Sequence, residues 1–196
     1  IGRLHAETIA SHSESTLHAV SDIDSGSANE LAVQYGAALK SSEEIISDPN
    51  IDAILIATST DTHAEFIEKA SLVGKSVFCE KPVDLSLSRA KECLNRVSAK
   101  NNPIMIGFNR RFDPNFAQLK KSLDDKEIGN SELLTITSFD PAPPPVSYVK
   151  TSGGLYRDMM IHDFDLSNFI MNELPVTISA VAVSYTHLRA HETLAD

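Results

Sequence analysis

The 196-residue sequence has no tryptophan, only two cysteines, and no apolar run of the roughly 18 to 20 residues that a membrane-spanning helix requires. Cys79 and Cys93 have neither a CxxC nor a metal-ligand spacing, so we expect both to be reduced and buried. No basic segment followed by an apolar one is found near residue 1, as a signal peptide would have, so we expect a cytoplasmic location. The 42% hydrophobic content favours a folded globular protein of one or two domains.

Positive charge is also scarce. Lys and Arg number 17 against 27 Asp and Glu, which gives a formal charge of -10, and the basic residues do not cluster. Nucleic acids and anionic membranes both require a positive face on their partner. We therefore expect neither as a partner, and small molecules are favoured as ligands.

The two ends of the chain depart from the pattern of a complete domain. Residues 1–10 read as a helix with no strand before them, so we expect that a first strand belongs upstream. Residues 183–196 continue no strand or helix pattern and resemble a translated sequencing adaptor, so they are excluded from fold reasoning. The exclusion covers His187 and His191, whose i, i+4 spacing would otherwise suggest zinc, and no metal site is predicted. We expect the 196-residue chain by itself to be inactive and poorly stable.

Between these ends, strand and helix patterns alternate. The run at 51–57 is unbroken and apolar, which predicts a parallel strand buried on both faces. Alternation at this spacing predicts a doubly wound parallel α/β sheet, a dinucleotide-binding domain over residues 1–106. The remaining predicted elements are strands at 16–24, 76–80 and 103–108, helices at 28–35, 61–73 and 86–99, and a short helix that Ser41 and Glu44 cap. In helix 86–99 the predicted buried face is Ala90, Cys93, Leu94 and Val97.

The rhythm changes after residue 106. A longer strand is predicted at 132–140, then a proline-rich loop, a helix at 153–169 and a strand at 175–183. We interpret residues 107–182 as the start of an α+β domain for substrate binding and oligomerisation.

Ligands of doubly wound sheets bind beyond the carboxyl ends of the strands, and the first such end carries Asp22. It follows Gly2 by about 20 residues, the spacing at which a carboxylate contacts the adenosine ribose; Gly2 would be the last glycine of a GxGxxG motif. The alternative is that Asp22 is only a turn residue. An acid here repels a 2'-phosphate, so NAD is favoured over NADP. Arg3 and Ile23 are assigned to the same cofactor site.

The second strand end carries Thr58 and Ser59. Their hydroxyls and backbone amides at a helix amino terminus suit the phosphates or the nicotinamide ribose of the cofactor, although both could equally be ordinary helix caps. His63, in the helix that follows, is expected to be a packed structural histidine.

The third strand end, "CEKPV", gives the strongest local signal. Lys81 follows an apolar strand and precedes Pro82, a proline that could be cis. We therefore expect Lys81, with Glu80, to lie where the nicotinamide and the substrate meet.

Three motifs together resemble the Gfo/Idh/MocA oxidoreductases, and among them the members that oxidise inositols: EKP, "GFNRRFDP" (107–114) and "GGLYRDMMIHDFD" (153–165). The resemblance implies a Rossmann domain, an open-sheet substrate domain that builds a homo-oligomer, and NAD-dependent oxidation of a ring hydroxyl of myo-inositol or a related inositol. It also implies catalytic roles for Lys81, Asp158 and His162, and substrate contacts for Asn109 and Arg110. The family often has Arg where this sequence has Phe139 and Asn168.

Alcohol oxidation explains the titrating groups in helix 153–169. His162 is suited to accept the hydroxyl proton near neutral pH. At i, i+4 spacing, Asp158 is predicted to lie on the same helical face and to orient the imidazole, while Lys81 stabilises the developing alkoxide. Asp163 is predicted to contact a substrate hydroxyl or to cap nearby backbone.

Blander interpretations remain open for this helix and its neighbours. The helix could hold a buried ion-pair network without chemistry, and Asp165 is expected to be structural. Arg111 is expected to pair with Asp113, and Tyr148 with the PAPPP loop to line the pocket. The rival functions are another sugar or polyol dehydrogenase and a nonenzymatic NAD-binding regulator, which would usually lose Lys81 or His162.

Overall fold

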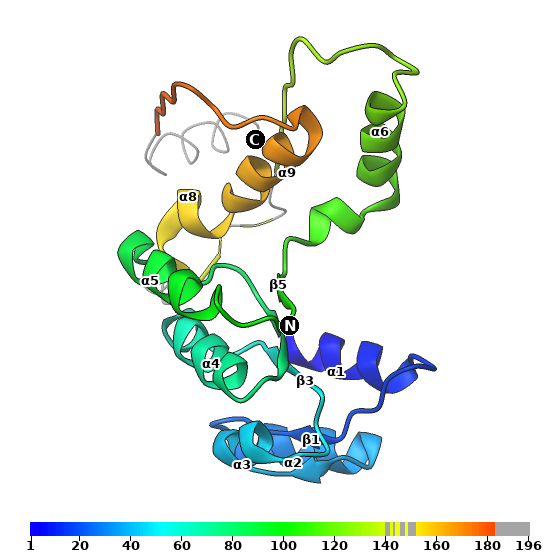
Figure 1. Cartoon of the computed structure of the whole chain (residues 1–196), viewed down its shortest axis with the longest axis vertical. Coiled ribbons are helices and arrows are strands. Elements are labelled where there is room, and N and C mark those ends of the chain that lie inside the picture. Colours follow the sequence, from blue (N-terminus) through cyan, green and yellow to red (C-terminus); the bar gives the residue numbers. More distant parts are fainter. Residues whose placement is uncertain (140–141, 143, 146–147, 149–151, 183–196) are drawn as a thin grey trace, which may run out of the picture.

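The computed structural model describes residues 1–139, 142, 144, 145, 148 and 152–182, arranged as parallel strands covered by helices (Figure 1). His187, His191 and part of the proline-rich loop lie outside the described residues. The strands are β1 (Ala19–Val20), β2 (Ala38–Leu39), β3 (Ala53–Ile56), β4 (Ser76–Cys79) and β5 (Ile104–Ile106). The helices are α1 (Gly2–Ser11), α2 (Ser25–Tyr35), α3 (Ser42–Ser47), α4 (Thr60–Leu72), α5 (Leu87–Val97), the 3-10 helix η1 (Asn109–Phe112), α6 (Pro114–Asp124), α8 (Gly154–Asp158) and α9 (Ile161–Met171).

The strands are parallel, as predicted, but they form two sheets instead of one. β1 pairs with β2, and β4 pairs with both β3 and β5. The order β2, β1, then β3, β4, β5 matches a doubly wound sheet, except that no strand of the described residues lies between β1 and β3. β3 therefore has a neighbour on one side only. This explains why the prediction of a fully buried strand is wrong: Ala53 is exposed and only Ile56 is buried.

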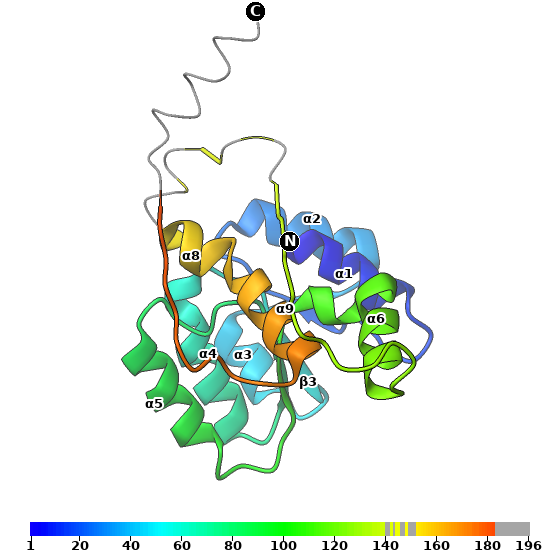
Figure 2. The ribbon, with the colours of Figure 1, turned by 90° about the horizontal axis from the view of Figure 1, so that it is seen from above.

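Helices cover both faces of the three-stranded sheet, as the Rossmann prediction requires. α4 and α5 lie together on one face and α1 lies on the other (Figures 1 and 2). The core between α4, α5 and the sheet consists of Ile56, Ala64, Ile67, Ala70, Val77, Cys79, Cys93 and Val97. Leu94, predicted for the buried face of α5, is 45% exposed and does not join this core.

Local sequence signals fix several helix ends. Asp24 caps α2 by accepting hydrogen bonds from the backbone N–H groups of Gly26 and Ser27, and the helix stops at Gly36, which has a φ of 67°. Ser41 and Glu44 form the predicted capping box at α3. These contacts are local in sequence, which is why the capping box could be predicted, although the Asp24 cap was not.

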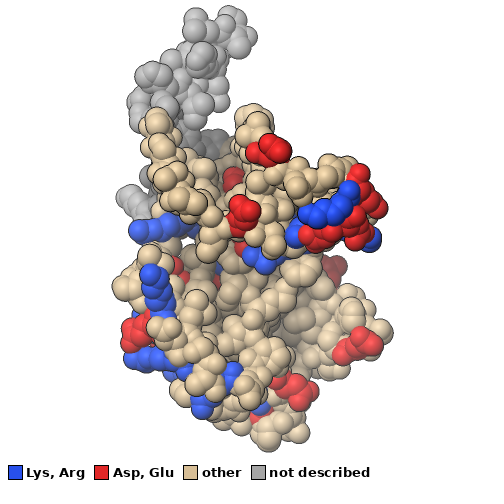
Figure 3. All heavy atoms as spheres, turned by 45° about the horizontal axis from the view of Figure 1, so that its top comes forward, with Lys and Arg blue, Asp and Glu red and all other residues tan. Residues whose placement is uncertain are grey.

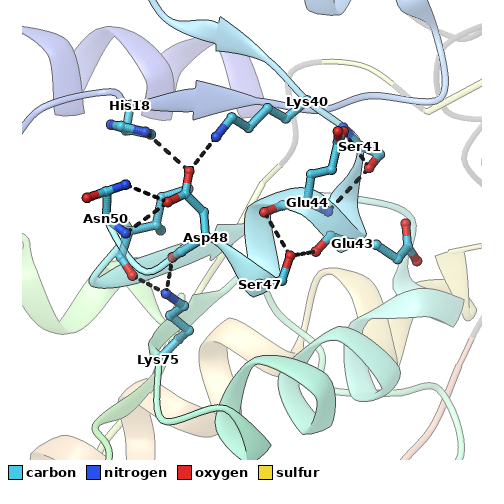
Figure 4. A network of polar contacts seen from close by, with 10 residues as sticks. His18, Lys40, Ser41, Glu43, Glu44, Ser47, Asp48, Asn50 and Lys75 are labelled. Atoms are coloured by element: carbon cyan, nitrogen blue, oxygen red, sulfur yellow. Dashed lines mark hydrogen bonds and ion pairs between the residues drawn. The ribbon is translucent and has the colours of Figure 1, made fainter.

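A polar network joins the two sheets (Figure 4). The Asp48 carboxylate, after α3, accepts hydrogen bonds from Lys40 Nζ, next to β2, and from the Asn50 backbone N–H at 2.8 Å. Lys75 Nζ, which precedes β4, donates to the carbonyls of Asp48 and Ile51 at 2.5 Å each. The network therefore connects β2 to the amino ends of β3 and β4.

The second part of the chain contains helices but no strand among its described residues. The strands predicted at 132–140 and 175–183 are absent over 132–139 and 175–182. Both patterns are β-like, but a strand requires a neighbour to satisfy its backbone, and no described strand lies beside either segment. Val176, Ile178 and Val181 are 80 to 99% exposed.

The helix predicted at 153–169 is split into α8 and α9. The backbone N–H groups of Met159 and Met160 both donate to the carbonyl of Leu155, at 3.2 and 2.9 Å. The second bond spans five residues, so one extra residue is inserted at the junction, as in a π-bulge. Asp158 and His162 therefore do not have the i, i+4 relationship of a continuous helix.

Charged side chains of both signs lie next to one another on the face of the molecule in Figure 3. On α6, for example, Lys120 and Lys121 pair with Asp124 and Asp125. No helix among the described residues is long and apolar enough to cross a membrane.

Candidate active site

The end of β4 is held in place by a buried histidine. The ring nitrogens of His63 lie 2.7 Å from the Pro82 carbonyl oxygen and 3.0 Å from that of Thr58, and the residue is 1% exposed. The Lys81–Pro82 peptide bond is cis. His63 thus has the packed, hydrogen-bonded role that the sequence predicts, and it connects the loops after β3 and β4.

Lys81 contacts Asp158 directly. Its Nζ donates to Asp158 Oδ1 at 2.9 Å and to the Asp158 carbonyl at 2.8 Å, and both side chains are less than one-quarter exposed. The Tyr148 hydroxyl donates to the same Oδ1 at 3.0 Å; burial, followed by this contact, raises the pKa of Tyr148. Two segments 77 residues apart in the sequence therefore meet at the carboxyl end of β4.

His162 lies in the same region, but Asp158 does not orient it. Nδ1 of His162 is buried and has no hydrogen-bond partner among the residues that the structure describes, so the prediction of an Asp158–imidazole bond at this nitrogen is wrong. The physical reason is the extra residue at Met159 and Met160, together with Lys81, which binds the carboxylate. Burial, then the positive charges of Lys81 and Arg110, lower the pKa of His162. A neutral imidazole at neutral pH is the form that accepts a proton.

Two arginines attach η1 to α9. Arg110 forms an ion pair with Asp163, which also accepts a hydrogen bond from the Ser138 hydroxyl at 2.7 Å. Arg111 binds the Asp165 carboxylate through two nitrogens, at 2.7 and 2.5 Å, and Asp165 is 9% exposed. The structural role expected of Asp165 agrees with this geometry.

The Arg111–Asp113 pair predicted from the sequence is wrong. Asp113 instead caps α6, where its carboxylate accepts hydrogen bonds from the backbone N–H groups of Asn115 and Phe116. Asn109 begins η1 and its side chain is exposed.

The residues predicted to bind the cofactor lie at the same edge of the sheets. Gly2 opens α1, and a Cβ built on it would lie 3.9 Å from Ala57, just beyond β3. Thr58 and Ser59 directly precede α4 and are exposed; Thr58 Oγ1 lies 2.7 Å from Thr62 Oγ1, and the Ser59 side chain makes no capping bond. Backbone N–H groups at the amino end of α1 and exposed hydroxyls at that of α4 fit a phosphate-bearing dinucleotide.

At the end of β1, Asp22 and Ile23 are exposed. Asp22 Oδ1 accepts the backbone N–H of Asp24 at 2.9 Å, the contact of a turn residue, and its exposure leaves it accessible to a ligand as well. Arg3 projects from α1 to form a 2.5 Å ion pair with Glu30 of α2. Arg3 therefore has a protein partner at the place where the sequence predicts a cofactor contact.

Sequence reasoning missed two polar residues at this site, His5 and Ser138, and the partner of a third, Tyr148, which it had expected to line the pocket. His5 of α1 lies 2.7 Å from Glu80, Ser138 contacts Asp163, and the Tyr148 hydroxyl contacts Asp158. His5 and Ser138 lie 75 and 25 residues from their partners in the sequence, so no local pattern indicates either contact. No group of three or more His, Cys, Asp or Glu residues in the described part of the chain could hold a metal ion.

Comparison with known proteins identifies the family. A family model described as "Oxidoreductase family, NAD-binding Rossmann fold" matches residues 1–108, and one described as "GFO/IDH/MocA C-terminal domain" matches residues 116–195. The chain belongs to the GFO/IDH/MocA oxidoreductase family. The predictions of a Rossmann fold and of NAD as the family's cofactor are thereby confirmed.

Several relatives in this family are named for inositols. Inositol 2-dehydrogenase from Rhizobium meliloti (strain 1021) is 46% identical over 93% of this chain and 55% of its own length. A myo-inositol dehydrogenase structure from Corynebacterium glutamicum matches with a TM-score of 0.82 at 39% identity, over 86% of this chain and 51% of the other. The scyllo-inositol dehydrogenase structure from Lactobacillus casei, with bound NAD(H) and scyllo-inositol, matches with a TM-score of 0.73 at 29% identity, over 87% and 53%. The chain thus spans about half the length of the curated relatives it matches.

Proposed function

We propose that the full-length protein containing this sequence oxidises a ring hydroxyl of myo-inositol, or of a related inositol, to the ketone with NAD. The observation that carries the proposal is the contact between Lys81 and Asp158 at the carboxyl end of β4, together with a partly buried His162 whose pKa is lowered by burial and by Lys81. This is the edge at which doubly wound sheets bind their ligands. The inositol names of several relatives support the choice of substrate.

We assign the proton transfer to His162. Nδ1 is buried, so Nε2 is the ring nitrogen that would accept the hydroxyl proton of the substrate. The lowered pKa keeps this nitrogen unprotonated near neutral pH, and the bound NAD would supply the hydride acceptor.

We assign charge stabilisation to Lys81. Two acceptors of Asp158 hold its ammonium group, at 2.8 and 2.9 Å, and an ammonium carries three N–H donors. The third donor can therefore reach the substrate oxygen and stabilise negative charge that develops on it. Asp158 in this proposal orients the lysine instead of the imidazole. Arg110 and Asp163 bind each other, so their substrate contacts remain proposals that require this pair to be accessible to a hydroxyl.

The test is NADH formation by the full-length protein with myo-inositol, scyllo-inositol and glucose, and with NADP in place of NAD. We expect NADH formation with an inositol and a loss of roughly 100-fold to 10,000-fold in kcat for His162→Gln, the range of general base catalysis. His12→Gln is the matched control, because His12 is an exposed histidine at the end of α1. Activity with glucose alone would indicate a sugar dehydrogenase instead of an inositol dehydrogenase. NAD binding without turnover of any of these polyols would favour a nonenzymatic NAD-binding regulator.

Lys81→Met separates the chemical role of the lysine from binding. We expect kcat to fall by about 100-fold or more, with NAD affinity changed far less, because the ammonium acts where charge develops. Asp158→Asn keeps the shape and should reduce kcat by a smaller factor. A Lys81→Met variant with normal kcat would contradict the assignment.

A further inference from the structure

Glu80 lies at the junction of α1, β4 and β5. Phe78 and Glu80 are two residues apart in an extended segment, so their side chains point to the same face, which α1 covers. Cys79 between them points to the opposite face, into the core with Cys93. Glu80 therefore lies between α1 and the end of β4, directly before Lys81.

His5 binds this carboxylate. Nε2 of His5 lies 2.7 Å from Glu80 Oε1, and the two side chains are 20% and 17% exposed. The His5 ring also packs edge-on against Phe78, with ring centroids 5.3 Å apart. The imidazole thus has contacts that fix both its position and its direction.

The other side of the carboxylate is closed by Gly107, which follows β5. A Cβ at Gly107 would lie 3.1 to 3.3 Å from all three atoms of the Glu80 carboxyl group, closer than most real Cβ contacts. The Glu80 carboxylate is therefore confined between the His5 ring and the backbone of Gly107. Loss of the His5 bond would leave it free to turn away toward solvent.

We propose that His5 is a positioning residue: by binding Glu80 it holds that carboxylate at the strand end where it acts electrostatically on His162. The proposal rests on the function proposed above only where it concerns catalysis. Four charged groups influence the pKa of His162: Lys81 after β4, Arg110 of η1, Asp163 of α9 and Glu80. Lys81 and Arg110 lower the pKa of His162, whereas Asp163 and Glu80 raise it. If the Glu80 carboxylate turned away, it would oppose Lys81 and Arg110 less, and the pKa of His162 would fall further.

The test measures the titration of His162 directly, by NMR on the full-length protein labelled at histidine. The His162 signal is assigned by its absence in His162→Gln. We expect Glu80→Gln and His5→Leu both to lower the pKa of His162, because each removes the Glu80 charge from its neighbourhood. His5→Gln, whose side-chain amide can still donate to Glu80, should keep the wild-type pKa.

Two outcomes overturn the proposal. One is a His162 pKa that falls in Glu80→Gln but stays at the wild-type value in His5→Leu, which would leave His5 with a packing role alone. The other is a pKa that moves in neither variant. Thermal unfolding of each variant shows whether it is folded at the temperature of the titration, and His5→Asn, which is shorter than Gln, serves as a second variant without the bond if His5→Leu does not fold.

The pH dependence of kcat/KM separates this inference from the proposed function. If His162 is the base, the acid limb should move to lower pH in His5→Leu and Glu80→Gln, and stay in place in His5→Gln. An NMR shift without a matching move of the acid limb would contradict the role of His162 as base and leave the positioning role of His5 intact.

Discussion

Residues 1–108 and residues 109–182 bury apolar side chains to very different degrees. In the first region, eight residues from both sides of the α4, α5 and sheet interface form one continuous core. In the second, Leu166 and Ile170 of α9 are the buried apolar residues among those described, while Leu133, Phe139, Leu174 and Val176 are 79 to 99% exposed. The first region is held by hydrophobic packing, whereas the second contains the ion pairs Arg110–Asp163 and Arg111–Asp165 and is joined to the first by Lys81–Asp158.

The difference lies in what each kind of element needs. A helix satisfies its backbone within its own segment, so α9 forms inside the range that the sequence predicts as helix, and α6 forms where no helix was predicted. A strand needs a neighbour, and the segments at 132–139 and 175–182 have none among the described residues. Their alternating apolar side chains therefore remain exposed, although the patterns are as β-like as those in the first region.

Core truncation should show the contrast most strongly. Ile67 is fully buried, so Ile67→Ala should lower the free energy of unfolding by about 2 to 5 kcal/mol. Ile178 is 80% exposed, so the same change there should stay within about 0.5 kcal/mol. Urea denaturation followed by circular dichroism measures both. Equal effects would mean that residues 175–182 pack against a partner in solution.

The Arg111–Asp165 pair tests whether polar contacts hold the second region. In Arg111→Met, Asp165 would keep a nearly buried charge without its partner, and we expect a loss of about 2 kcal/mol, since Arg111 itself is partly exposed. Lys121→Met removes an exposed pair on α6 and should cost less than about 0.5 kcal/mol.

A second substitution checks the cause of that loss. Arg111→Met combined with Asp165→Leu should recover most of the stability, because no charge then remains buried. Urea unfolding compares the single and double variants. A double variant as unstable as the single one would show that the arginine stabilises through packing on Phe108 and Phe169 instead.

Much of the fold was predictable because its signals are local. The Asp24 cap, the stop at Gly36 and the Ser41–Glu44 capping box involve residues within a few positions of one another. The division into two sheets was not predictable, because strand pairing depends on residues distant in sequence. The same reason applies to 132–140 and 175–183, which have a strand pattern and no described partner.

The sequence predicted which residues belong to the candidate site better than it predicted the contacts between them. Lys81 and Asp158 were expected in one place because of a strand end and a motif, and the structure brings them within 2.9 Å. The prediction that Asp158 orients His162 was wrong because it assumed a continuous helix through Met159 and Met160. His5 was missed because a single histidine on a helix carries no sign of a carboxylate 75 residues away.

Within the first region, the Asp48 network should respond to pH. Lys40, followed by the Asn50 backbone N–H, lowers the pKa of Asp48, so the native state favours the ionised carboxylate. Its stabilisation is present above the unfolded-state pKa of about 3.9 and is lost as the pH falls through the lower, native value. Asp48→Asn should therefore lower Tm by a few degrees at pH 7, and the difference from wild type should shrink below about pH 4. Thermal scans across this range measure it, with Glu43→Gln, at an exposed glutamate of α3, as the control. A difference that is constant with pH would contradict an ionic contribution.

The smallest expected effect is the absence of alkylation at Cys79 and Cys93 in the native protein. The same measurement shows whether the first region stays folded when the second is destabilised. Burial raises the pKa of Cys79 to about 12 and that of Cys93 to about 11, so few thiolates exist at pH 8 and neither thiol is accessible. We expect no alkylation by iodoacetamide under native conditions and full alkylation in urea. Because both cysteines lie in the core of the first region, Arg111→Met should leave them protected while residues 109–182 become sensitive to protease. If Arg111→Met exposed the cysteines to alkylation and residues 109–182 to protease at the same time, the two regions would unfold as one unit despite their different packing.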